Sequence, residues 1–382
     1  MKPHGLTSVY EFLSDFLVYR NLRPLDARLP ALDDVRDRAG VPTAMTPRKS
    51  EPAYARVIVE ILRAARALDA PERPLERVVY IGDTCMNDGT AFTNIARAGD
   101  WPGLAFIASE REAPDPPEII EEDETSEAPR ALYLADRWAA ISDFVSFCRA
   151  RDFPVDAGTA VIVDLDKTAL GARGRNDHVI NQARVEAVRR TVGELLGDAF
   201  DPRAFQAAYD VLNESEFHPF TADNQDYLAY ICLILGSGLY ELQPLMARVR
   251  AGGLTSFEPF IAQVDARRDD LALSLREIHQ RIYGRVRAGD PTPFKAFRYN
   301  EYVATVERMG CLGDDASVEM LLAEEIVITE EVREAALRWK ARGALLFGLS
   351  DKPDEASIPG DALARQGYVP IHRVQTHAVG EA

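Results

Sequence analysis

The stretch that decides the fold is VIVDLDKT, residues 161–168, in which an apolar β-branched run ends in two aspartates and a threonine. A short run of this kind is typical of a strand buried on both faces of a parallel sheet. Asp164, Asp166 and Thr168 are then expected at the carboxyl edge of the sheet, where open α/β sheets bind their ligands. The stretch therefore predicts a fold class and a place for a functional site.

A second stretch of the same kind is VVYIGDTCMND, residues 78–88, in which an apolar run ends near Asp83 and Asp88. If the two strands are neighbours, their carboxylates converge on one crevice. Carboxylates at close range repel one another, and a hard divalent cation with oxygen ligands removes that repulsion; magnesium is the usual ion beside a substrate phosphate. For either motif alone a simpler alternative stays open, in which each aspartate only caps the turn or helix after its strand.

The segments around these motifs alternate between strand and helix patterns, which predicts a parallel sheet with both faces covered. Strands are expected at residues 78–81, 104–108, 160–163 and 344–349, with a weaker one at 368–371. Helices are expected at residues 54–65, 88–96 and 135–148. Residues 111–130 are rich in proline and acid, so we expect them to form an exposed loop.

From about Gly171 to about Arg342 the pattern is helical throughout, with no strand signal. Helices are expected at residues 178–196, 202–213, 224–236, 268–285, 294–308 and 329–342. An insertion of roughly 170 residues has the size of a separate domain. We therefore expect a discontinuous α/β core made of residues 1–170 and 343–382, interrupted by a helical domain of residues 171–342.

The composition limits the class of partner. A formal net charge of −17 argues against binding to nucleic acid or to an anionic membrane surface, because both repel an acidic protein. The four cysteines are far apart and lack metal-ligand spacing, which favours reduced thiols in a cytoplasmic protein and disfavours zinc. No signal peptide and no apolar run long enough to span a bilayer are recognised.

Taken together, the motifs resemble those of the haloacid dehalogenase-like hydrolases. DLDKT (164–168) resembles their first motif, DxDxT, and GDTCMND (82–88) resembles their fourth, GDxxxxD. Ser350, at the end of the strand in ALLFGLSDKP, resembles the second-motif Ser or Thr, and Lys49 resembles the third-motif lysine that stands before the helix leading into the fourth-motif strand. Two alternatives stay open: Ser350 as a helix N-cap and Lys49 as a solvated surface lysine.

The order of the motifs differs from that of the family. Here the third motif comes first, followed by the fourth, the first and the second, and a circular permutation of the family's chain explains this order. The resemblance then implies a doubly wound parallel sheet whose strands, numbered along this chain, lie in the order 2-1-3-4-5. It also implies that the helical insertion is a cap domain, since the family places a cap between its first and second motifs.

The resemblance implies a chemical role for each motif residue. Asp164 corresponds to the nucleophile that forms an aspartyl-phosphate, and Asp166 to the general acid and base. Lys49, Thr168 and Ser350 correspond to the phosphate-binding side chains. An acid at position 166 favours phosphate chemistry, because the dehalogenases of the superfamily lack it.

The resemblance also implies a cofactor and a substrate class. Mg²⁺ is expected on Asp164, on the backbone carbonyl of Asp166 and on Asp83, with Asp88 in support. The function expected is that of a magnesium-dependent phosphatase of small phosphorylated metabolites. A phosphotransferase or phosphomutase, or a catalytically silent binding or regulatory protein of the same fold, remains the alternative.

Overall fold

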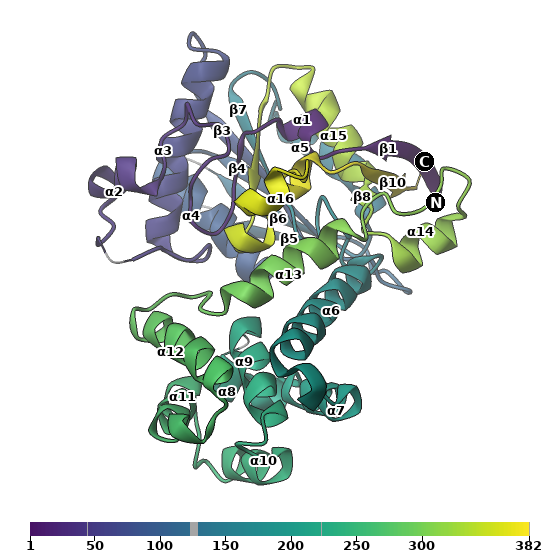
Figure 1. The fold of residues 1–382 in the computed structure, drawn as a ribbon. Helices are drawn as coiled ribbons and strands as arrows, with labels where there is room; N and C mark the ends of the chain where they lie inside the picture. Colours follow the sequence, from purple (N-terminus) through teal and green to yellow (C-terminus); the bar gives the residue numbers. More distant parts are fainter. Residues whose placement is uncertain (44, 123–128, 223, 382) are drawn as a thin grey trace. The chain divides into compact units, whose positions relative to one another are not determined.

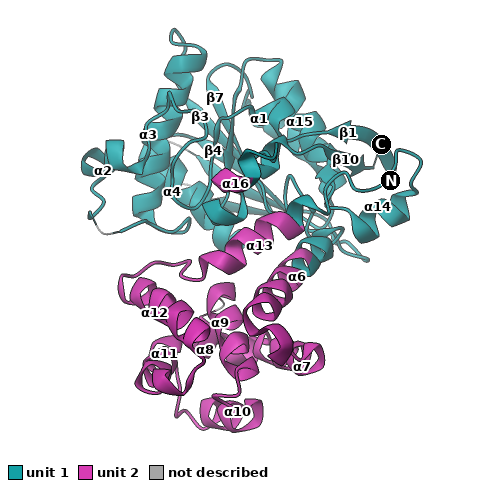
Figure 2. Ribbon diagram, in the orientation of Figure 1, with its two compact units in different colours: residues 1–182, 305–358, 363–382 teal, residues 183–304, 359–362 magenta. Residues whose placement is uncertain are grey.

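The computed structural model describes residues 1–43, 45–122, 129–222 and 224–381. The chain divides into two compact units, coloured separately in Figure 2. Unit 1 comprises residues 1–182, 305–358 and 363–382, and unit 2 comprises residues 183–304 and 359–362. None of the described helices is both long enough and apolar enough to cross a lipid bilayer.

Unit 1 is built on a seven-stranded, mostly parallel sheet (Figure 1). From one edge to the other its strands are β2 (Leu17–Val18), β9 (Leu345–Leu349), β7 (Thr159–Asp164), β3 (Arg77–Gly82), β4 (Gly103–Ala108), β6 (Arg130–Ala135) and β5 (Glu118–Glu122). Only β5 runs antiparallel to its neighbour. The α/β class is therefore confirmed, and four expected strands, β4, β3, β7 and β9, lie in the expected order.

Two expectations about the edges of this sheet are wrong. Residues 368–371 form no strand, because Pro370 has no N–H for a strand ladder and precedes a 3-10 turn, Ile371–Arg373; β2 takes the edge instead. Residues 111–130 are not wholly a loop, since they contain β5; residues 123–128 of this segment lie outside the described ranges. The expected helix at 135–148 begins only at Ile141, because Ala135 ends β6, a strand that was not expected, and Trp138–Ala140 form a 3-10 turn.

Helices cover both faces of the sheet, as a doubly wound fold requires. On one face, α2 (Leu32–Ala39), α3 (Pro52–Asp69) and α4 (Thr90–Gly99) share a buried core with alternate strand residues such as Tyr80 and Ile107. On the other face, Phe144 of α5 (Ile141–Ala150) packs on Phe106, and α5 contacts α15 (Glu330–Lys340) (Figure 1). Successive residues of one strand thus point to opposite faces.

A smaller sheet in unit 1 joins the two ends of the chain. β1 (Lys2–Thr7) pairs antiparallel with β10 (Thr376–Gly380), which pairs in parallel with β8 (Ile328–Thr329). The expectation of no strand between Gly171 and Arg342 is therefore wrong at β8. Two short helices, α1 (Tyr10–Leu13) and α14 (Val318–Glu324), also belong to this unit.

Unit 2 is helical. The helices that lie wholly within it are α7 (Pro202–Leu212), α8 (His218–Thr221), α9 (Gln225–Gly236), α10 (Leu242–Arg250), α11 (Phe257–Ala266) and α12 (Leu273–Arg287). The helices that it shares with unit 1 in sequence are α6 (Asp177–Leu196), α13 (Lys295–Val306) and α16 (Asp361–Ala364). α10 and α11 had no counterpart among the expected helices. Residues 171–182 and 305–342, which the sequence grouped with the insertion, make their contacts within unit 1, so unit 2 is shorter than 171–342.

Candidate active site

Three carboxylates meet at the carboxyl edge of the main sheet. β3 and β7 are adjacent and parallel, so Asp164 at the end of β7 lies close to Asp83, the first residue after β3. One carboxylate oxygen from each of Asp83, Asp88 and Asp164 lies within 4.8 Å of the others. The expectation that the two motif strands are neighbours is confirmed, and the crossover through α4 and α5 is what brings residues so distant in sequence together.

Asp88 reaches the group because the chain after β3 turns tightly. The turn Cys85–Gly89 is π-helical, and the Asp88 carboxylate accepts hydrogen bonds from the backbone N–H groups of Asp83 and Thr84, each at 3.0 Å. The carboxylate thus packs against the end of its own strand. Gly82 permits this packing, since a Cβ there would lie 2.5 Å from the Asp88 Cβ.

Lys49 enters the same group from the segment before α3. Its Nζ donates to Asp88 Oδ1 at 2.6 Å and to Asp164 Oδ1 at 2.5 Å, and its side chain is only 6% exposed. The Tyr80 hydroxyl also donates to Asp88 Oδ1, at 3.1 Å. Because Lys49 is buried, the alternative that it is a solvated surface lysine is wrong. A buried ammonium keeps its charge only where carboxylates pair with it, as Asp88 and Asp164 do here.

The electrostatics of the group reflect its burial. Burial raises the pKa of Asp83 to about 7, and the charge of Asp88 adds to this shift. Burial would also raise the pKa of Asp88, but Lys49 outweighs it and holds that pKa below its ordinary value. Burial raises the pKa of Asp164 well above its ordinary value despite Lys49. Lys49 and Arg173 therefore do not offset the effect of burial on the pKa of every carboxylate in the group.

Asp166 and Ser350 follow the ends of β7 and β9, at the same edge of the sheet as this group. The Asp166 carboxylate is 30% exposed, and its Oδ1 lies 3.8 Å from Nζ of Lys352, a buried lysine that the sequence did not single out. The buried Ser350 hydroxyl accepts the Lys352 N–H at 3.1 Å. Ser350 is not a helix N-cap, because the next helical turn begins at Asp354 and follows Pro353.

Thr168, which was expected to bind phosphate, lies in the loop that follows β7. It is completely buried, its carbonyl accepts the Thr329 hydroxyl, and its own hydroxyl has no hydrogen-bond partner among the described residues. Ser350 is buried to a similar degree, and the role of Thr168 as a phosphate ligand stays a prediction. The loop after β7 folds back so that Ala169 donates to the Asp164 carbonyl at 3.2 Å, and this turn carries Thr168 inward.

Arg173 is the main feature of the site that sequence reasoning missed. Its Nε donates to Asp83 Oδ2. The signal that was present is the pair of glycines in ALGARGR: Gly171 and Gly174 both have positive φ, so the chain doubles back over the edge of the sheet. Arg175, by contrast, is buried against Glu331 and serves the fold.

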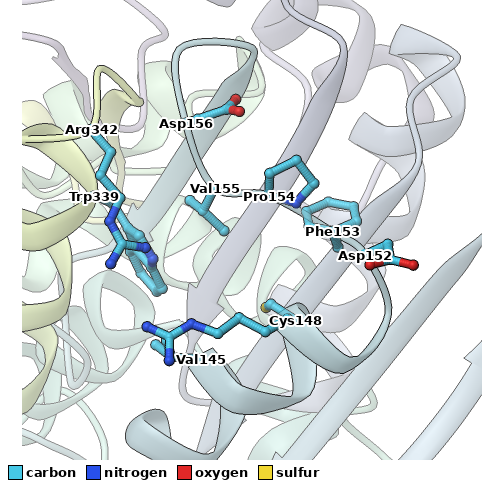
Figure 3. Close-up of a pocket in the computed structure, with 10 residues that line it drawn as sticks. Val145, Cys148, Asp152, Phe153, Pro154, Val155, Asp156, Trp339 and Arg342 are labelled. Carbon is cyan, nitrogen blue, oxygen red and sulfur yellow. The ribbon is translucent and has the colours of Figure 1, made fainter.

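A cavity of about 490 Å³ lies elsewhere in unit 1 (Figure 3). It is lined by the end of α5, the loop leading into β7 and the end of α15, with Trp339 and Arg342 extending from the α15 side. These segments precede β7 and β9, so the cavity is at the amino edge of the sheet. It contains none of the candidate site residues.

Comparison with known proteins found no relative of this chain: no family model, no curated protein and no solved structure matches it. The assignment of a function therefore depends on the geometry of the site and on the resemblance of its motifs.

Proposed function

We propose that this chain is a magnesium-dependent phosphatase of small phosphorylated metabolites that works through an aspartyl-phosphate on Asp164. The observation that carries the proposal is the buried group of Asp83, Asp88 and Asp164, with Lys49 bonded to two of its oxygens, at the carboxyl ends of adjacent parallel strands. Ligands bind at this edge in open α/β sheets. The resemblance to the first and fourth motifs of the haloacid dehalogenase-like hydrolases supports the same chemistry.

The donor set suits a hard divalent cation. The nearby side chains offer carboxylate oxygens, which Mg²⁺ prefers, and Lys49 and Arg173 are the cations seen to pair directly with the three clustered aspartates within the described residues. Asp83 and Asp164, with the Asp166 carbonyl, would hold the ion. When bound, it supplies positive charge that attracts the phosphoryl oxygens and reduces their repulsion of Asp164.

The residues of the chain account for the remaining chemistry. Lys49 fixes Oδ1 of Asp164 and so orients this carboxylate at the strand end. A carboxylate oxygen of Asp164 forms a bond to phosphorus as the bond to the leaving oxygen breaks, and Asp166 gives that oxygen its proton. Asp166 then takes a proton from water, which attacks phosphorus, releases phosphate and restores Asp164. Asp166 is partly exposed, so its carboxylate can exchange protons with water.

The test is a panel of phosphorylated metabolites, assayed for phosphate release with and without Mg²⁺, on the wild type and on Asp164→Asn. We expect release that needs Mg²⁺ and falls at least about a thousandfold in the variant, whose circular dichroism stays unchanged. Transfer to an added alcohol in place of water would instead indicate a phosphotransferase. Release that persists in a folded Asp164→Asn protein would refute the proposal, and absence of turnover on the whole panel would favour a silent binding protein.

A further inference from the structure

The backbone at Arg173 is held from several directions. Its N–H donates to the Lys167 carbonyl at 2.8 Å, and its carbonyl accepts the Glu110 N–H at 2.9 Å and the Trp138 indole N–H at 3.1 Å. Gly174 beside it has a φ of +76°, and a Cβ there would lie 2.0 Å from the Glu110 carbonyl oxygen, so only glycine allows this approach. These contacts fix the backbone of the loop, whereas the Arg173 side chain can still change its conformation.

The side chain of Arg173 is bound at one point only. Its Nε donates to Asp83 Oδ2, and the structure records no further hydrogen bond or ion pair of this guanidinium within the described ranges. The side chain is 36% exposed, whereas that of Asp83 is 8% exposed. Lys49 differs in both respects, because it is enclosed and bonds to two carboxylates. Arg173 is therefore the accessible cation of the group.

A divalent cation and this guanidinium compete for the same carboxylate. Asp83 is the proposed metal ligand, and its Oδ2 is the atom that Arg173 occupies. A guanidinium next to a doubly charged ion is repelled by it. Binding of the ion to Asp83 thus weakens the ion pair and frees a side chain whose two terminal nitrogens are already without partners among the described residues.

Building on the metal site proposed above, we propose that Arg173 exchanges partners during the reaction cycle. It neutralises Asp83 while the site holds no cation, and it turns to the phosphoryl oxygens of the substrate once the ion has taken its place. The planar fork of a guanidinium matches two phosphoryl oxygens at once, which an ammonium does not. The exchange makes binding of the phosphorylated substrate depend on prior loading of the metal, and it assigns to Arg173 a role in substrate affinity.

The direct test follows the Nε–H signal of Arg173 by ¹⁵N NMR of the full chain, with the signal assigned by its loss in Arg173→Lys. We expect it to shift when MgCl₂ is added, and to shift again when inorganic phosphate is added to the Mg²⁺-loaded protein. Arg111 is the matched control, because its Nε pairs with Asp136 Oδ1 at 3.0 Å outside the acidic group. Its signal should not move at either step.

Calorimetry of Mg²⁺ binding separates this inference from the proposed function. Arg173→Ala should bind Mg²⁺ about tenfold more tightly, because the competing cation is gone, and should bind phosphate in the presence of Mg²⁺ about tenfold more weakly. Arg111→Ala should change neither, and Arg173→Lys should restore the metal affinity but not the phosphate affinity. Tight Mg²⁺ binding with an unmoved Arg173 signal would overturn the exchange alone. A wild type that binds no Mg²⁺ would overturn the exchange and the metal site together.

Discussion

Lys49 and Asp164 stand 115 residues apart in the chain, yet Nζ of Lys49 donates to Oδ1 of Asp164 at 2.5 Å. The same ammonium donates to Asp88 Oδ1 at 2.6 Å. One buried cation thus bridges the ends of two parallel strands. Because a charge in such a place is tolerated only when it is paired, the three side chains depend on one another for their ionised states.

Replacing Lys49 by Met tests this dependence. The change leaves two buried carboxylates without their shared cation, so we expect the free energy of unfolding in Mg²⁺-free buffer to fall by about 3–5 kcal/mol. Added Mg²⁺ should recover part of the loss, since a ligand that binds only the folded state stabilises it. Urea denaturation with and without Mg²⁺ measures both effects. Lys2→Met, at an exposed lysine, is the control, and an equal loss there would contradict the interpretation.

Gly82→Ala tests whether the packing of Asp88 on its own strand positions the carboxylate. The new Cβ would lie 2.5 Å from the Asp88 Cβ, so Asp88 must shift and we expect Mg²⁺ affinity and phosphatase activity to fall about tenfold or more. Gly284 in α12 is the matched control, because a Cβ there meets nothing within 4 Å. Gly284→Ala should keep the activity and gain slightly in helix stability. Unchanged Mg²⁺ affinity in Gly82→Ala would show that Asp88 is not part of the metal site.

Asp166→Asn should separate phosphorylation from hydrolysis. The carboxamide keeps the shape of the side chain but cannot transfer a proton, while the backbone carbonyl of the residue is unchanged. With a substrate whose leaving group needs no protonation, the aspartyl-phosphate on Asp164 should form and persist. Mass spectrometry after brief exposure to an activated phosphoester detects the adduct. Normal turnover without a trapped adduct would mean that Asp166 only shapes the site.

His372 should make the stability of the protein depend on pH. Burial lowers its pKa to about 4, although Asp15, 3.1 Å from Nε2, opposes this shift. Between pH 6.5 and 4 the unfolded chain therefore takes up a proton that the folded protein does not, so unfolding becomes easier as the pH falls. The contribution of this one residue is at most on the order of 3 kcal/mol.

Urea denaturation at several pH values in this window measures the slope. His372→Gln should flatten it, because the group that titrates differently in the two states has been removed. His178→Gln, at an exposed histidine, should leave the slope as it is in the wild type. Equal slopes in the wild type and in His372→Gln would show that other groups govern the acid sensitivity.

The sequence predicted strands and helices correctly where the local pattern of apolar residues determines them. The runs before Asp164 and Asp83 are strands, and the expected helices 178–196, 202–213 and 224–236 correspond to α6, α7 and α9. Prediction from local sequence failed where pairing with neighbouring strands determines the secondary structure. No strand was expected at ALYLA, residues 131–135, yet this run lies in β6, which pairs with β4 on one side and β5 on the other.

By itself, therefore, the sequence determined that the chain folds as an α/β protein and that aspartates stand at the ends of two buried strands, because apolar periodicity and strand length are local properties. Only the tertiary structure decided which side chains meet there. It buried Lys49 between two carboxylates, turned Arg173 back onto Asp83 and carried Thr168 inward. Contacts between residues far apart in the chain follow from strand order and loop closure, and no periodicity along the sequence records them.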